Sequence, residues 1–148
     1  MISTLTALAA LAGAQLSQAG EIRQNLPADI APRFVVGDMR TIHGADIGVA
    51  TLSKGRTGAT MRIELHSGAL KPGRYEVFVQ EKAACAIPAK RTRQGAFQAP
   101  KAGRIYAQFS NTEIRLNDAA DAPLLGAEGV AVVINGGGRR VACAEIRG

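Results

Sequence analysis

Few side chains in this sequence are suited to chemistry, and the two histidines are the first candidates. His43 and His66 have no cluster of Asp, Glu or Cys beside them, and neither lies in a glycine-framed nucleophile turn. A Ser–His–Asp or Cys–His catalytic arrangement is therefore not indicated. A metal or copper-handling site remains an alternative, with His43 and His66 as imidazole ligands and Met39 or Met61 as a weak thioether donor.

A run of three glycines, Gly136–Gly138, is a second candidate, as a phosphate-binding loop. It follows one predicted strand and leads into another, whereas a phosphate loop places its backbone N–H groups at the start of a helix. The run is therefore predicted to be a turn between two strands.

The clearest charge feature is a basic segment between residues 82 and 104. It contains six Lys or Arg residues and no Asp or Glu, which equals the whole net charge of +6. We predict a basic loop that binds an anionic partner, either another protein or an anionic surface; the alternative is a solvated loop. Nucleic acid is not expected as the partner, because the chain has four Phe, two Tyr and no stacking signature. The basic residues are Lys82, Lys90, Arg91, Arg93, Lys101 and Arg104.

The first nineteen residues, MISTLTALAALAGAQLSQA, carry no charge and contain an apolar run typical of a signal peptide, although no Lys or Arg precedes it. Ser17 and Ala19 place small residues at the two positions that a signal peptidase recognises, which predicts cleavage before Gly20. The run is too short and too rich in Ala, Ser and Thr for a membrane span. We expect a periplasmic or secreted protein; the alternative is a retained apolar helix that anchors it to a membrane or a complex.

The two cysteines, Cys85 and Cys143, lack the C-x-x-C spacing of redox and zinc motifs. An even pair behind an export signal favours one structural disulfide, and two buried free thiols are the alternative. The bond would close a loop of about 58 residues, worth about 4 kcal/mol in the chain-entropy model.

Short runs with a period of two, separated by Gly, Pro, Asn and Asp, predict strands rather than helices. In residues 60–66 every second side chain is apolar, as in a half-buried antiparallel strand. We expect one all-β sandwich or barrel formed by residues 46–148, after a lead-in segment at 20–45 that is mostly loop. Residues 82–103 are predicted to be a long loop. Strands are predicted at 33–36, 47–53, 60–66, 74–80, 104–110, 112–116, 130–135 and 139–146.

Several short segments, in their order along the chain, resemble the Cu/Zn superoxide dismutase family. They are IGVATLS, LKPGRYEVFVQEKAAC, LLGAEGVAVVIN and GGGRRVACAEI, and the similarity spans about residues 45–148. The resemblance implies a Greek-key β-sandwich or flattened barrel of about seven or eight antiparallel strands. It also implies that Cys85 and Cys143 form the family's intrasubunit disulfide, and that Arg140 matches the arginine that helps to draw superoxide toward copper.

The family's copper ligands are replaced at every position that we aligned. Its two histidines separated by one residue match Phe78 and Gln80, and its late-strand histidine matches Asn135. The stretch that matches its zinc-binding loop, residues 86–103, contains no His, Asp or Glu. The resemblance therefore implies a degenerate member of the family that lacks the metal ligands.

The chemistry of the three replacements argues against a copper site. Two residues separated by one lie on the same face of a strand, which lets two imidazoles converge on one ion. Copper needs nitrogen or sulfur donors, whereas Phe78 offers none and the amides of Gln80 and Asn135 are poor ones. We expect Phe78 to fill the vacated volume, and Gln80 and Asn135 to hydrogen-bond to each other.

The leading hypothesis is thus a non-catalytic, metal-free superoxide dismutase-like domain without a cofactor. Its role would be binding or structural. A third hypothesis, besides the metal-handling alternative, is that the basic loop and Arg140 dock the domain onto a larger, membrane-associated complex. In that case the lead-in segment and a retained apolar N-terminus would add contacts.

Overall fold

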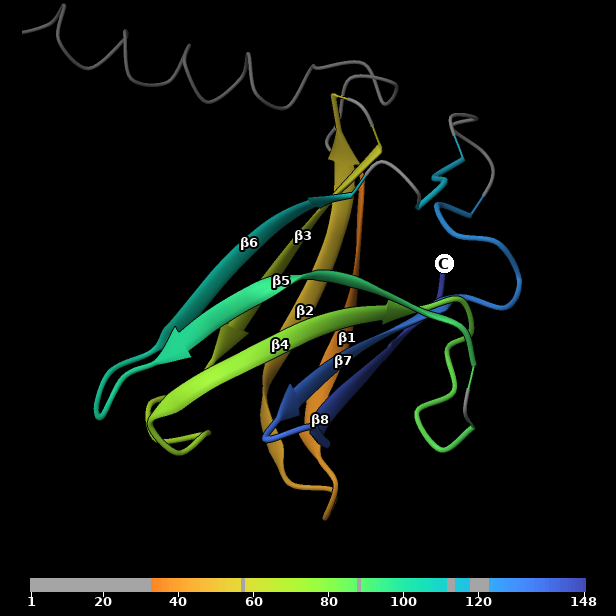
Figure 1. Cartoon of the computed structure of the whole chain (residues 1–148). Helices are drawn as coiled ribbons and strands as arrows, with labels where there is room; N and C mark the ends of the chain where they lie inside the picture. Colours follow the sequence, from red (N-terminus) through yellow and green to blue (C-terminus); the bar gives the residue numbers. More distant parts are fainter. Residues whose placement is uncertain (1–32, 57, 88, 112–113, 118–122) are drawn as a thin grey trace, which may run out of the picture. The chain divides into compact units, whose positions relative to one another are not determined.

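The computed structural model describes residues 33–148, except residues 57, 88, 112–113 and 118–122. Every regular element in this described part is a β-strand (Figure 1). The predicted leader at 1–19 and residues 20–32 of the predicted lead-in lie outside the described residues. The strands are β1 (Phe34–Thr41), β2 (Asp46–Gly55), β3 (Gly58–Leu65), β4 (Gly73–Gln80), β5 (Arg91–Ala99), β6 (Ile105–Asn111), β7 (Val130–Gly136) and β8 (Arg139–Ile146).

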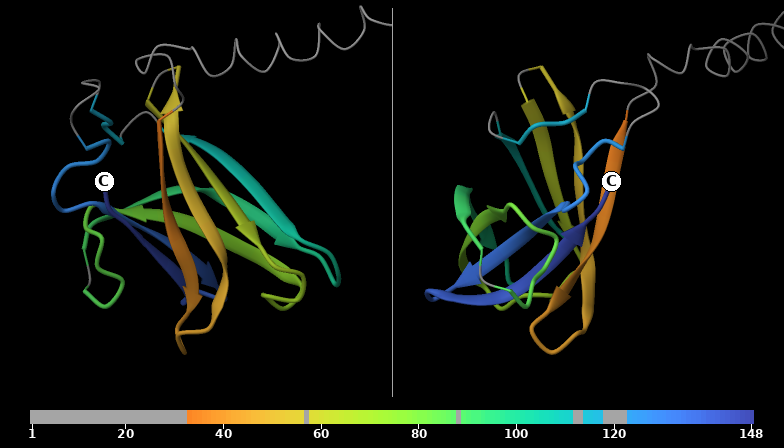
Figure 2. Two further views of the ribbon diagram at one scale, coloured as in Figure 1. Left: turned by 180° about the vertical axis from the view of Figure 1, so that it is seen from behind. Right: turned by 90° about the vertical axis from the view of Figure 1, so that its right-hand side faces the viewer.

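The strands form one antiparallel sheet in the order β5-β4-β7-β8-β1-β2-β3-β6, which curls into a nearly closed barrel (Figures 1 and 2). The two outermost strands, β5 and β6, meet through side chains. Asn111 Nδ2 donates a hydrogen bond of 2.6 Å to Gln94 Oε1, and Gly95 lies against the ring of Phe109. A Cβ atom at Gly95 would be 2.6 Å from Phe109 Cε1, so this seam requires glycine. The predicted all-β, Greek-key barrel is confirmed.

The core follows from the alternation of apolar residues along the strands. On β3, Met61, Ile63 and Leu65 are buried, whereas Arg62 and Glu64 are exposed, as predicted. The inner residues of the other strands complete one apolar cluster. Its fully buried members include Met39, Leu52, Val77, Val132, Ile134, Ala144 and Ile146.

Three sequence predictions about the strands are wrong. The described part of the lead-in segment, residues 33–45, is mostly strand rather than loop, since β1 pairs with β2 from Phe34 to Arg40 and with β8 from Met39 to Thr41. Residues 82–103 are not one loop, because β5 pairs with β4 along its whole length. Residues 114–116 form no strand; Ile114 instead caps the core from a loop, where it is 8% exposed.

Because all neighbouring strands are antiparallel, the connections gather at the two ends of the barrel. We call one end the turn end; it holds the connections β1–β2, β3–β4, β5–β6 and β7–β8. The other, the loop end, holds β2–β3, β4–β5 and β6–β7 (Figure 1). Within the described ranges no helix is long and apolar enough to span a membrane.

Candidate functional site

Phe78, Gln80 and Asn135, which the sequence resemblance aligns with copper ligands, lie on the outer face of β4 and β7. Phe78 is opposite Val133 in the sheet, Gln80 is opposite Ala131, and Glu76 is opposite Asn135. Phe78 is half-buried and packs against a small apolar cluster on this face. Its ring thus covers an apolar patch on the outer face of the sheet. The cluster consists of Ala131, Val133, Cys143 and the partly buried Cys85.

Gln80 is fully buried, and its amide holds the β4–β5 connection at residues 81–90 in place. Its Nε2 donates hydrogen bonds of 2.8 Å to Ala84 O and 3.0 Å to Ile87 O. Its Oε1 accepts a hydrogen bond of 3.3 Å from Arg91 Nε. Both ends of the amide are thus occupied within the protein, which satisfies a polar group that would otherwise be costly to bury.

The predicted hydrogen bond between Gln80 and Asn135 is wrong. Asn135 is opposite Glu76, four residues before Gln80 on β4, which corresponds to roughly 13 Å along the strand. Its Oδ1 atom is buried and has no hydrogen-bond partner in the described part of the chain. Two residues on one sheet face contact each other only when the register brings them opposite, and here it does not.

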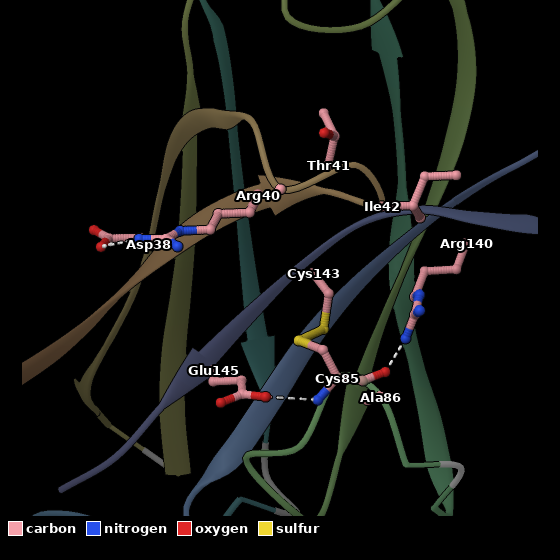
Figure 3. Close-up of a pocket in the computed structure, with 10 residues that line it drawn as sticks. Asp38, Arg40, Thr41, Ile42, Cys85, Ala86, Arg140, Cys143 and Glu145 are labelled. Atoms are coloured by element: carbon pink, nitrogen blue, oxygen red, sulfur yellow. Dashed lines mark hydrogen bonds and ion pairs between the residues drawn. A yellow bond between two sulfur atoms is a disulfide. The ribbon is translucent and has the colours of Figure 1, made fainter.

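The 81–90 connection is also attached to β8, as Figure 3 shows. The disulfide predicted between Cys85 and Cys143 is present, with the two Cα atoms 6.0 Å apart. Glu145 Oε1 accepts a hydrogen bond of 2.9 Å from Cys85 N, and an Arg140 Nη1 group donates to Cys85 O. Arg147 Nη2 donates one of 2.8 Å to Ala83 O. Arg140 is therefore committed to the backbone beside the disulfide.

A groove of about 460 Å³ lies beside this attachment, on the outer side of β1 and β8 (Figure 3). Its charged lining contains both signs. Arg40 pairs with Asp38 at 3.7 Å, and Arg140 and Glu145 both contact Cys85. The lining includes no nucleophile with a base beside it, and its sulfur atoms are in the disulfide. The groove therefore has the character of a polar surface depression rather than of a catalytic centre.

The six cations of the predicted basic loop do not share one loop, so the prediction that they form a single loop is wrong. Lys82 pairs with Glu128 at 3.7 Å, Lys90 with Glu81 at 4.0 Å, and Arg93 with Glu76 at 3.2 Å. Arg91 donates to Gln80. The physical reason is that β5 returns beside β4, which brings Glu76 to Arg93 and Glu81 to Lys90, while Glu128 of the β6–β7 connection reaches Lys82. The remaining two, Lys101 and Arg104, lie at the opposite end of β5, at the turn end.

The two histidines are exposed and lie at the turn end. His43 is in the β1–β2 turn and His66 directly follows β3. Met39 and Met61 are fully buried in the core, with 0% exposure. No group of three or more His, Cys, Asp or Glu side chains in the described ranges is arranged to hold a metal ion. The geometry thus does not bring the alternative ligands together.

Comparison with known proteins supports the fold and gives no closer assignment. No known family model and no curated protein sequence matches the chain. Two solved structures of an SOD-like protein from Bacillus subtilis, a double mutant and a single mutant, are similar to it. The first has a TM-score of 0.59 and 11% identity, and the second has 0.57 and 12%. Each alignment covers 76% of this chain and 97% of the other. The chain therefore has a superoxide dismutase-like fold.

Proposed function

We propose that this chain is a metal-free, non-catalytic superoxide dismutase-like domain that is exported and has a binding or structural role. The observation that carries the proposal is the set of hydrogen bonds that the Gln80 amide forms within the protein. This residue matches a copper ligand, yet its buried amide donates to Ala84 O and Ile87 O and accepts from Arg91. The position therefore organises the fold instead of binding a metal.

The other two matched positions support the same proposal. Phe78 offers no donor atom and packs on the cluster around Val133 and Cys143. Asn135 faces Glu76 and offers an amide, which is a poor donor for copper. A tight copper site requires several nitrogen or sulfur donors that converge, and these three side chains do not converge.

Export is supported by the disulfide as well as by the apolar N-terminal sequence. A bond such as Cys85–Cys143 persists in oxidising compartments and is rare in the cytosol. Fractionation of the native host should place the protein outside the cytoplasm, with both cysteines resistant to alkylation unless a reductant is added.

Metal analysis of the purified full chain tests the central claim. After loading with copper and zinc and extensive dialysis, we expect substoichiometric metal and no dismutase activity. Retention of one copper per chain, or dismutase activity above that of free copper, would overturn the proposal. A Phe78→His/Gln80→His variant is the positive control, because two residues separated by one on the same face of β4 let two imidazoles converge on one ion. It should bind more copper than the wild type in the same assay.

A further inference from the structure

The unpaired positive charge of this domain gathers at the turn end. Five exposed Lys or Arg side chains belong to the β3–β4, β5–β6 and β7–β8 connections or to the strand residues beside them. The acids at the corresponding positions of this end, within two residues of a connection, are Asp46, whose Oδ1 accepts from Gly48 N, and Glu64, which lines a depression together with Arg104. We call the five residues the turn-end cluster: Lys71, Arg74, Lys101, Arg104 and Arg139.

None of the five forms an ion pair with another described residue. At the loop end and along β5, by contrast, Lys82, Lys90 and Arg93 each have an acid within 4.0 Å. Five like charges without internal counter-charges repel one another, which disfavours the folded state. Such an arrangement is understandable when an external anion supplies the missing charge.

The connections that carry the cluster adjoin one another. Gly103 N in the β5–β6 turn donates a hydrogen bond of 3.0 Å to Ser67 Oγ in the β3–β4 connection. In the sheet β4 lies between β5 and β7, with Arg74 opposite Gln98 on β5. The β4–β7 register, extended past Asn135, brings Arg74 alongside the β7–β8 turn. The five cations thus form one basic surface.

We propose that the turn end docks on an anionic lipid surface. Cations on the tips of separate connections reach a flat surface together, and each Lys or Arg near an anionic membrane strengthens binding about fivefold. Exposed apolar side chains also lie at this end. Ile42, in the β1–β2 turn, is 57% exposed, and Tyr106, at the start of β6, is 57% exposed. An aliphatic side chain and an amphipathic tyrosine beside basic residues suit a membrane interface.

An acidic protein and a nucleic acid fit these observations less well. A stable protein interface has an apolar core of clustered residues. Ile42 and Tyr106 belong to separate elements, the β1–β2 turn and strand β6. Single-stranded nucleic acid needs several aromatic side chains along a basic groove, and among the described residues Tyr106 is the exposed aromatic side chain at this end. The inference rests on the binding role within the proposed function, for which it names the partner. Metal content does not enter into it.

The test is a vesicle co-sedimentation assay with the full chain as purified. We expect binding to phosphatidylglycerol-containing vesicles, weaker binding to pure phosphatidylcholine vesicles, and loss of the difference at high salt. Lys71→Gln/Arg74→Gln/Arg139→Gln should lower the partition coefficient on the order of 100-fold. The matched control, Lys82→Gln/Lys90→Gln/Arg93→Gln, removes three charges as well and should lower it less than about tenfold. All variants keep the same N-terminal segment, so its own membrane affinity cancels.

Three outcomes would overturn the inference. One is an equal loss in both triple variants, which would show that net charge alone drives binding. A second is equal binding to anionic and neutral vesicles. The third is binding to polyglutamate, but not to vesicles, that depends on the turn-end cluster; this would indicate an acidic protein partner. Ile42→Ser gives a second readout, because membrane insertion predicts a loss of several-fold whereas a purely electrostatic contact predicts none. The metal assay above is independent of all of these outcomes.

Discussion

Both ends of the barrel carry several cations, but the two ends differ in whether those cations have acidic partners within the protein. At the loop end, side chains from β4 and β8 hold the 81–90 connection, and its two lysines face acids: Lys82 faces Glu128 of the β6–β7 connection and Lys90 faces Glu81. At the turn end, short connections carry cations that face solvent. The first end is held together by contacts within the protein, and the second is the end for which we propose an external partner. The difference teaches that a basic run in the sequence is a poor guide to a basic surface, because strand pairing can place acidic side chains beside its cations.

The largest expected effect is loss of the disulfide at the loop end. Replacing both cysteines (Cys85→Ser/Cys143→Ser) should lower the free energy of unfolding by about 4 kcal/mol, since the bond closes a loop of 58 residues. Urea unfolding of the wild type with and without reductant measures the same quantity. Vesicle binding through the turn end should persist while the reduced protein stays folded. A loss of stability below about 1 kcal/mol would show that the loop end does not depend on its covalent attachment.

Gln80 should have the next largest effect. Gln80→Leu keeps the side chain close in volume but leaves the carbonyls of Ala84 and Ile87 without their donor, at a cost of about 2–3 kcal/mol. Amide hydrogen exchange should increase within residues 81–90 and not at the turn end. The matched control is Gln98→Leu, an exposed position of β5 near the turn end, which should change stability by less than about 0.5 kcal/mol. Equal effects at the two positions would remove the distinction between the ends.

The sequence predicts the fold well because the alternation of apolar residues is encoded locally, and because two cysteines can form only one disulfide within the chain. Residues 60–66 and 130–135 bury alternating or continuous apolar faces, and both are strands in the structure. Strand β5 was missed because it is only partly buried and has Gln94 and Gly95 at its centre. Both residues make contacts across the β5–β6 seam, Gln94 with Asn111 and Gly95 with Phe109. No local pattern reveals a contact of that kind.

The candidate site was less predictable for the same reason. Its residues were identified from motif order, but their partners depend on register. Asn135 is opposite Glu76 rather than Gln80 because of the β4–β7 pairing, which no spacing within either strand specifies. Glu145 and Arg147, which attach the 81–90 connection, are more than 50 residues from it in sequence.

Asn135 provides a smaller test with the opposite sign. Its Oδ1 is buried without a partner, so Asn135→Leu removes an unsatisfied acceptor and should raise the free energy of unfolding by about 1 kcal/mol. The same amide-to-leucine change thus stabilises the protein at one matched copper position and destabilises it at the other, Gln80. Denaturant unfolding of the two single variants and the double variant measures both effects. Destabilisation by Asn135→Leu would mean that its amide has a role that Gln80 shares.

The smallest expected effect separates the two ends by sign. Lys82→Gln/Lys90→Gln/Arg93→Gln removes three exposed ion pairs and should lower stability by about 1 kcal/mol in total. Lys71→Gln/Arg74→Gln/Arg139→Gln removes cations that only repel one another, so stability should rise by about 0.5 kcal/mol at low salt. Both differences should shrink near 0.5 M salt, where the Debye length is only about 4 Å. If the turn-end triple variant is destabilised instead, its cations have acidic partners within the protein, and they are not held ready for an anionic surface.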